Sequence, residues 1–446
     1  MKCTKKHLLL ITYFYPPIQA APSYRTVSFV KYLPRFGYQV TVLTVTINKF
    51  TWNGPLSEPF ISRDNVLRTR CFNIGEFLKA LFPGRFSGYG KTRTEFKSKH
   101  ASAIKKSLVY LYDNLLTFPD PAWLWYPLGM NKAIRIAKQI KPDIILSSAM
   151  PISAHLLALH IKSRLHIPWI ADYRDLWSQS HINYRKPIFN RLERSIENKI
   201  IKEADALTTV SEPLAIKLRQ QYKKLVHVIT NGYDPDDFDV LLNKKPSDWN
   251  YTQINAVYTG MIYPERQDPK PLFKAIQLLI ETNRIKQGDF KFRLFGPNLG
   301  FVKSLFPSNL LEEFVVIGDN LPRDHALNYQ KKADLLIVFD WTDTEEKGVY
   351  TTKFFEYIGA EKPILSIGPK GTVIDCALRK DKLGISENDP NLVADILEDF
   401  IKSKHLKGYN RSKQKVNQTL EKYTRNYQAR NLANIMDYIL DKNRCV

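Results

Sequence analysis

The sequence predicts an α/β protein with two doubly wound domains, each a parallel sheet covered by helices on both faces. Short continuous apolar runs alternate with amphipathic helical patterns, which is typical of parallel sheets. The alternation stops at a polar stretch around residues 232–251 and then starts again. The chain has 446 residues, too many for one hydrophobic core, which favours two or three domains.

The first domain is assigned to residues 1–232. Its first apolar run follows three lysines, as in a signal peptide, but Pro16 and Pro17 end it without a clean cleavage site, so we interpret it as a buried strand. The expected strands are 7–13, 39–44, 143–148, 169–173, 206–210 and 226–230. The expected helices are 23–36, which would end at Gly37, and 152–164, 188–203 and 213–222.

The second domain is assigned to residues 253–420, after a linker at 233–252 that is rich in Asp, Asn, Lys and Pro. Its expected strands are 254–259, 292–295, 314–317, 335–339 and 364–367. Its expected helices are 271–282, 323–332, 352–360 and 392–403. Residues 421–446 are expected to form a helix that packs back toward the first domain. Ligands are expected at the carboxyl ends of the strands, in the cleft between two facing domains.

Charge divides the chain into two unlike halves. Residues 1–232 hold 35 Lys and Arg against 14 Asp and Glu, a net of +21, while the remaining residues hold 31 against 30, a net of +1. A field of this kind attracts nucleic acid, an anionic membrane or phosphorylated substrates, and composition does not choose among them. Eight of the bases and one acid lie in residues 79–106, interleaved with aromatic residues. That stretch is either a membrane-docking surface or a solvated helical excursion that packs on the domain.

Composition and cysteine spacing exclude several classes. Apolar residues make up 44% and charged residues 25%, which excludes a disordered protein, a collagen-like fibre and a disulfide scaffold. No apolar run approaches the roughly 18 to 20 residues of a membrane span. The four cysteines and nine histidines show no metal-ligand spacing, so we expect no metal site and a reducing compartment. The acidic run at 234–239 has the composition of a turn.

Two strand-to-loop junctions are candidates for binding an anion. The first domain has Ala20 and Ala21 in a small-residue loop, with Arg25 about one turn into the next helix, where it would reach an anion. The alternative is that the loop only turns the chain. In the second domain Gly260 ends a strand and Arg266 would suit a diphosphate, because its guanidinium is planar and permanently charged. The alternative there is a surface arginine paired with a nearby acid, Glu265 or Asp268.

Two further motifs combine charges at expected strand or helix ends. Thr351 or Thr352 would cap a helix whose amides face a phosphate, with Lys353 and Glu356 on one helix face. The alternative is a plain ion pair on a solvated helix. In the first domain Asp172, Arg174 and Asp175 follow a strand directly, where chemistry would lie in such a fold. The alternative is a structural cluster of salt bridges.

The order of these motifs resembles family 4 of the retaining glycosyltransferases, which have the GT-B fold of two facing Rossmann-like domains. The resemblance covers nearly the whole chain. It rests on collinear pieces: 15–17 through Arg25, 37–44, 141–143, 204–206, 210–212, 231–234, 258–260, 333–334, 355–357 and 362–364.

The resemblance implies that the second domain holds a nucleotide diphosphate sugar and that the first domain meets the acceptor. Glu356 matches the second carboxylate of the family's Glu-x7-Glu motif, but Gly348 stands at the first. Met261 replaces one member of a basic pair whose other member is Arg266. Ala20-Ala21 replaces the usual glycine pair of the first loop, and Arg174-Asp175 stands where relatives place a histidine near the phosphates.

The implied reaction transfers the sugar with retention and needs no metal or other cofactor. Arg266, Lys353 and the helix amides near Thr351 and Thr352 would stabilise the leaving diphosphate. Glu356 would orient ribose or sugar hydroxyls, and Asp175 would hold the sugar or acceptor. With the charge split, this implies a cytoplasmic enzyme bound peripherally to the inner face of a membrane and acting on a lipid-linked glycan or surface polysaccharide. The alternatives are an inactive GT-B protein that serves as a membrane-associated partner, or a basic nucleic-acid-binding protein.

Overall fold

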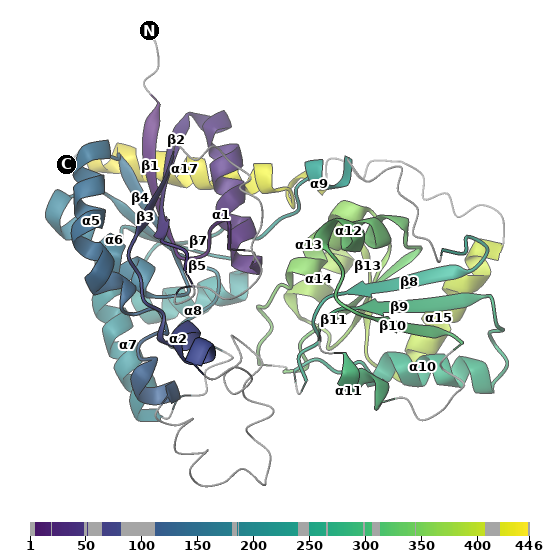
Figure 1. Ribbon diagram of the computed structural model, residues 1–446. Helices are drawn as coiled ribbons and strands as arrows, with labels where there is room; N and C mark the ends of the chain where they lie inside the picture. The colour runs from purple at the N-terminus through teal and green to yellow at the C-terminus, as the bar shows by residue number, and fades with distance from the viewer. Residues whose placement is uncertain are drawn as a thin grey trace. The chain divides into compact units, whose positions relative to one another are not determined.

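The chain forms two compact units, Met1–Thr230 with Ala429–Val446 and Asn231–Gln428 (Figure 1). The computed structural model describes residues 5–18, 20–48, 51, 65–81, 112–180, 185, 187–239, 249–264, 266–297, 299–305, 313–343, 345–405 and 420–444.

The first unit contains a seven-stranded parallel sheet in the order β3-β2-β1-β4-β5-β6-β7. Its strands are β1 (Lys6–Thr12), β2 (Tyr38–Val45), β3 (Val66–Thr69), β4 (Ile144–Ala149), β5 (Trp169–Tyr173), β6 (Ala206–Thr209) and β7 (Val226–Val228). The strand order reverses between β1 and β4, which creates the topological switch point where ligands of such sheets bind.

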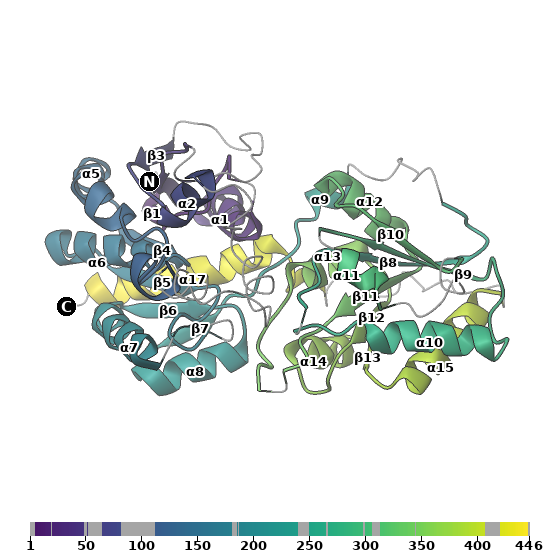
Figure 2. The same cartoon turned by 60° about the horizontal axis from the view of Figure 1, so that its bottom comes forward.

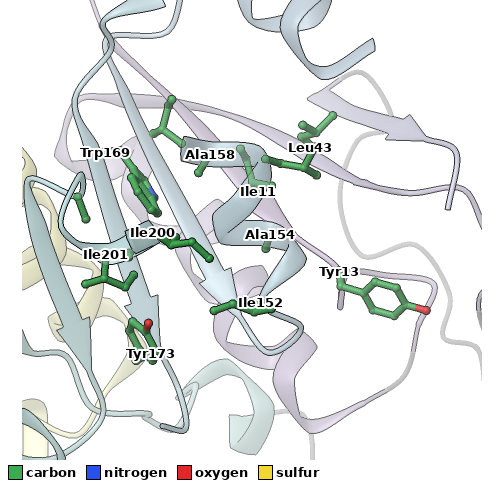
Figure 3. Close-up of a cluster of buried hydrophobic side chains, with 14 of the residues drawn as sticks. Ile11, Tyr13, Leu43, Ile152, Ala154, Ala158, Trp169, Tyr173, Ile200 and Ile201 are labelled. Carbon is green, nitrogen blue, oxygen red and sulfur yellow. The ribbon is translucent and has the colours of Figure 1, made fainter. Parts of the chain in front are cut away.

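Alternate residues of β1 enter cores on opposite faces of this sheet, as the period of a strand requires. Leu9 and Ile11 pack with helices α5 (Trp125–Ile140), α6 (Ser153–Leu165), α7 (Pro187–Ile201) and α8 (Glu212–Tyr222). Figure 3 shows part of this core around Ile11, Ala154 and Trp169. Leu8 and Leu10 pack with α1 (Ala21–Tyr32) and the end of α17 (Arg425–Arg444).

The second unit repeats the architecture with six parallel strands in the order β10-β9-β8-β11-β12-β13. The strands are β8 (Ile254–Thr259), β9 (Phe290–Phe295), β10 (Val315–Gly318), β11 (Leu335–Phe339), β12 (Ile364–Ile367) and β13 (Gly384–Glu387). Its switch point lies between β8 and β11.

Helices cover both faces of the second sheet. Helices α10 (Lys270–Glu281) and α15 (Pro390–His405) pack on one face, and α12 (Arg323–Lys332), α13 (Thr352–Ala360) and α14 (Val373–Lys380) pack on the other. Figure 1 shows α12 and α13 above the strands and α10 below them, and Figure 2 shows the unit turned so that α10 comes forward. The remaining short helices are α2 (Ile74–Leu81), α9 (Asp236–Asp239), α11 (Gly300–Lys303), a 3-10 turn (Leu33–Phe36) and a π-helical turn (Tyr112–Leu116).

The predicted fold class, two doubly wound parallel sheets, is confirmed. The first helix begins earlier than expected, at Ala21, because Pro22 is tolerated in a first turn. It ends earlier as an α-helix, because Pro34 cannot donate a hydrogen bond, and Gly37 closes the 3-10 turn at a φ of 84°. The strands β3 and β13 were not predicted, since both are short, partly exposed strands at a sheet edge.

Two sequence interpretations concern the surface and the membrane. The basic stretch 79–106 lies outside the described residues except for its first three, which end α2. Among the helices that the structure describes, none combines the length and the apolar character needed to cross a bilayer.

Shortening Ile11 tests the first core. Ile11 is fully buried between the sheet and its helices, so Ile11→Ala removes apolar contacts and leaves a cavity, at a cost of about 2–5 kcal/mol in unfolding free energy. Urea denaturation followed by tryptophan fluorescence measures this loss. Ile216→Ala on α8 is the control, because Ile216 is 45% exposed and its loss should change stability by less than about 0.5 kcal/mol. Equal effects of the two substitutions would contradict the assigned core.

Candidate functional site

The switch point of the second unit brings together predicted residues from two distant stretches of the chain. Gly260 directly follows β8, and its φ is 150°. A Cβ at this position would lie 3.4 Å from Cγ of Lys353, which belongs to the first turn of α13. The positive φ is what favours glycine at position 260, and the lysine stem lies against the end of β8. This places a cation at the carboxyl edge of the sheet, where the topology predicts a ligand.

One oxygen of the Glu356 carboxylate is held by two donors. Lys353 Nζ lies 2.9 Å from Glu356 Oε2, and Gln330 Nε2 donates to the same oxygen at 3.0 Å. Gln330, fully buried on α12, also donates to Thr259 Oγ1 at 2.8 Å. Of the residues described, none donates to the second oxygen, Oε1. The carboxylate is thus oriented by one oxygen and can accept a ligand hydroxyl with the other.

Glu356 remains ionised although it is buried. Burial raises the pKa of its carboxyl group, but the charges of Lys353 and Arg323 and the hydrogen bond from Gln330 outweigh burial, so the pKa lies below its usual value. Arg323, the first residue of α12, pairs with Asp237 at 2.8 Å. The site therefore holds a permanent acceptor surrounded by cations.

The start of α13 presents a capped helix end. Thr351 is the N-cap residue, and its Oγ1 accepts a hydrogen bond from the amide of Phe354 at 3.4 Å. Thr352 and Lys353 occupy the first turn, where helix amides lack an acceptor four residues earlier. A helix N-terminus with a lysine in its first turn favours an anion.

Arg266 lies on a loop that is fastened to the loop after β11. Gln267 Nε2 donates to the Phe339 carbonyl at 2.6 Å, and the Thr342 amide donates to the Arg266 carbonyl at 2.8 Å. The Arg266 guanidinium is 4.0 Å from Asp343, a long and exposed ion pair that contributes little stability. Arg266 therefore lies on the same edge as Gly260, and its contact with a diphosphate stays a prediction.

In the first unit, Arg25 points to a buried carboxylate, whereas the sequence analysis expected it to reach an anion at the loop. Its guanidinium binds both oxygens of Asp172, at 2.7 and 3.1 Å, and donates to the carbonyls of Ile229 and Thr230. Arg25 and Asp172 are buried, so the arginine is directed into the protein rather than toward an anion at the start of α1. Ala20 is the N-cap residue of that helix, and Ala21 begins it without a bulky side chain.

Asp172 is the centre of this buried cluster. Burial raises the pKa of its carboxyl group, but the charge and hydrogen bonds of Arg25 and the hydroxyls of Thr208 and Ser148 outweigh burial and lower the pKa. Asp172 and Arg25 thus form a structural salt bridge, which was the alternative interpretation of the motif around Asp172.

Arg174 and Asp175 diverge from this cluster. Arg174 donates from Nε to the Ala149 carbonyl at 2.7 Å and from Nη2 to the Met150 carbonyl at 2.6 Å, which ties the ends of β4 and β5 together. Asp175 is exposed, and no described residue pairs with it. Of the two acids in this motif, Asp172 and Asp175, only the exposed Asp175 is therefore accessible to a ligand.

Two buried residues at the second switch point were missed by the sequence analysis. Gln330 orients Glu356 by a hydrogen bond. The sequence feature that could have revealed it is a glutamine on the buried face of a predicted helix, one turn after Leu327. Asp340 follows β11, where burial raises its pKa to about 6 despite a hydrogen bond from Thr372. No group of three His, Cys, Asp or Glu side chains suited to a metal occurs within the described ranges.

The buried pair in the first unit predicts a stability effect. Arg25→Met leaves the Asp172 carboxylate without its counter-charge, which costs about 3–5 kcal/mol of unfolding free energy at pH 7. Because the folded-state pKa of Asp172 is lowered, its contribution is present above the unfolded pKa and is lost as pH falls through the folded pKa. Urea titrations at pH 7 and at acid pH measure both effects. Arg25→Met/Asp172→Asn should recover part of the loss, and an unchanged double variant would contradict the pairing.

A close backbone approach fixes the Gly260 loop. A Cβ on Gly296 would lie 1.8 Å from the Gly260 carbonyl oxygen, so Gly296→Ala must displace this loop. We expect a loss of about 1–3 kcal/mol in unfolding free energy, as for an overpacked core position. Gly300→Ala is the matched control, because its Cβ would meet no atom within 4 Å. Thermal denaturation of both variants measures the difference, and equal melting temperatures would contradict the close approach.

The family model described as Glycosyltransferase Family 4 matches residues 94–237. No curated protein matches the chain by sequence.

Solved structures resemble the whole chain in fold. A glycosyltransferase from Rickettsia africae is 14% identical, with a TM-score of 0.60 over 98% of this chain and 99% of that one. Sucrose-phosphate synthase from Thermosynechococcus elongatus is 12% identical, with a TM-score of 0.61 over 98% and 100%. Anabaena HepE in complex with UDP is 13% identical, with a TM-score of 0.51 over 98% of both chains. The chain therefore has the GT-B glycosyltransferase fold, and the match over residues 94–237 confirms its resemblance to glycosyltransferase family 4.

Proposed function

We propose that this protein transfers a sugar from a nucleoside diphosphate donor to a lipid-linked glycan or surface polysaccharide, with retention of the anomeric configuration. The observation that carries the proposal is the Glu356 carboxylate, oriented through Oε2 by Lys353 and Gln330 beside Gly260 and the start of α13. That arrangement supplies a cation and helix amides for a diphosphate and a carboxylate oxygen for hydroxyl groups.

The donor would occupy the carboxyl edge of the second sheet. Lys353 and the amides near Thr351 and Thr352 would neutralise the diphosphate, and Arg266 on the neighbouring loop would add a second cation. Oε1 of Glu356 would accept a ribose or sugar hydroxyl. The UDP bound to the structurally similar HepE supports a nucleotide donor of this class.

The reaction would break the bond between the anomeric carbon and the diphosphate oxygen on the face where the acceptor oxygen adds. Negative charge grows on the leaving diphosphate, so cations and amides fixed beside it stabilise the transition state more than the ground state. The departing phosphate oxygen would take the acceptor's proton, and no covalent enzyme intermediate is needed. On the first unit, Asp175 would hold the sugar or acceptor, and Arg174 would keep the preceding strand end in place for donor contact.

The acceptor is assigned from charge. Residues 1–232, nearly all of which belong to the first unit, carry a net charge of +21, and we propose that the small-residue loop at Ala20 and Ala21 meets the acceptor. A polyanionic lipid carrier at the inner face of a membrane matches that charge, so we propose a cytoplasmic protein bound there peripherally.

Two alternatives predict different measurements. The first alternative is an inactive GT-B partner protein, because Gly348 and Met261 stand where the family carries a carboxylate and a base. Such a protein would bind a donor without turnover. A nucleic-acid-binding protein would show salt-dependent affinity for RNA or DNA and no response to nucleotide sugars. The oriented carboxylate at Glu356 favours a donor-binding protein over a nucleic-acid-binding one, and measured turnover distinguishes the transferase from the inactive partner.

Nucleoside diphosphates and their sugars, tested as a panel by thermal shift, should raise the melting temperature of the wild-type protein through binding to the folded state. Lys353→Ala should weaken this binding at least tenfold, because a charge contact to the diphosphate is lost.

Glu356→Gln should lower kcat for the identified donor by about 10²–10³, the typical effect of losing one preorganised polar contact.

Lys402→Ala is the control for Lys353→Ala, since Lys402 forms a comparable ion pair with Glu398 on the surface of α15. It should leave donor binding unchanged. Donor stabilisation unchanged in Lys353→Ala, together with unchanged turnover in Glu356→Gln, would place the donor elsewhere and overturn the proposed site.

A further inference from the structure

The outer face of α7 exposes apolar and cationic side chains together. Ile188 and Leu192 are 57% and 46% exposed and lie four residues apart, so they share one face of the helix. Arg191, three residues after Ile188, and Lys199, seven residues after Leu192, are exposed on the same face. Isolated exposed apolar residues are ordinary on a protein surface, but a pair on one helix face flanked by cations forms an amphipathic surface.

The two acids of α7 face inward. Glu193 is buried and pairs with Arg185 at 2.6 Å. Glu197 is also buried, and it accepts a hydrogen bond from the amide of Ser178 at 3.3 Å. The solvent face of the helix therefore carries positive charges without any acid of the helix to offset them.

The π-helical turn Tyr112–Leu116 also exposes apolar side chains, Leu115 and Leu116. The chain after this turn packs on the start of α7: the rings of Phe118 and Phe189 are 5.9 Å apart, and Arg185 donates to the Thr117 carbonyl at 2.7 Å. Four large apolar side chains are thus exposed on two elements that these contacts join.

We propose that this α7 surface, formed by Leu115, Leu116, Ile188, Leu192, Arg191 and Lys199, docks on an anionic lipid bilayer. Apolar side chains of such a surface enter the boundary between headgroups and acyl chains, while cationic side chains pair with headgroup phosphates. An anionic bilayer matches a face with two exposed cations and no exposed acid among the residues of α7. The inference deepens the proposed function and rests on it for the lipid-linked acceptor, which a docked first unit would meet at the membrane.

Vesicle flotation of the full chain tests the proposal. Wild-type protein should bind vesicles containing about one third phosphatidylglycerol at low salt, bind vesicles of phosphatidylcholine alone weakly, and dissociate as salt rises. Ile188→Asp/Leu192→Asp should lower the apparent affinity at least tenfold. Arg191→Glu/Lys199→Glu should do so as well, because each basic residue at an anionic surface contributes about a fivefold factor.

Ile216→Asp on α8 is the matched control, because it places the same charge at an exposed isoleucine of the same unit and should not change binding. Wild-type protein that ignores anionic vesicles, or binding unaffected by either double variant, would overturn the proposal. A concentration-dependent dimer abolished by Ile188→Asp/Leu192→Asp, without vesicle binding, would also overturn it in favour of a self-association surface.

Thermal shift with nucleoside diphosphates on the same preparations separates this proposal from the proposed function. Stabilisation by the donor should be equal in wild-type and α7 variants. Loss of vesicle binding with intact donor stabilisation identifies a docking defect alone. Vesicle binding without any donor stabilisation would leave the α7 surface supported and the transferase proposal refuted.

Discussion

The candidate site depends on the orientation of one buried carboxylate. Glu356 remains charged inside the protein because Lys353, Arg323 and Gln330 together outweigh the cost of burial. Gln330 also binds Thr259, the last residue of β8, so the carboxylate is fixed relative to the strand end rather than to its own helix alone. A group fixed in this way needs no rearrangement when a ligand hydroxyl arrives, which is the condition for preorganised electrostatic stabilisation.

The two units use charge at their sheet edges in different ways. In the first unit Asp172 and Arg25 satisfy each other, and hydroxyls and carbonyls complete their hydrogen bonds. In the second unit Lys353 is partly exposed, and Glu356 has an oxygen to which no described residue donates. A fully satisfied pair maintains the fold, whereas a partly satisfied one can bind a ligand, so similar residue types near the carboxyl ends of strands in the two sheets have different consequences.

The fold class could be predicted because buried parallel strands are continuous apolar runs in the sequence. Such runs occur at β1, β8 and β11. Short edge strands such as β13 lack this signal. The association of Lys353 with Glu356 was predictable from helix spacing. The role of Gln330 was not, because it depends on α12 packing beside α13. The inward direction of Arg25 required the position of Asp172, 147 residues away in the chain.

The first unit holds several of its acids away from the surface. Asp172 and Glu193 pair with Arg25 and Arg185 inside the protein, so each of these pairs contributes no net charge. Burial raises the pKa values of Asp120 and Glu197, even though hydrogen bonds oppose the effect, so both carboxyl groups are more readily protonated than exposed ones. These four acids are buried, so they do not lie beside the exposed lysines and arginines. Burial of carboxyl groups thus shapes the field that an anionic partner meets, as it does locally on α7, where both acids of the helix face the interior.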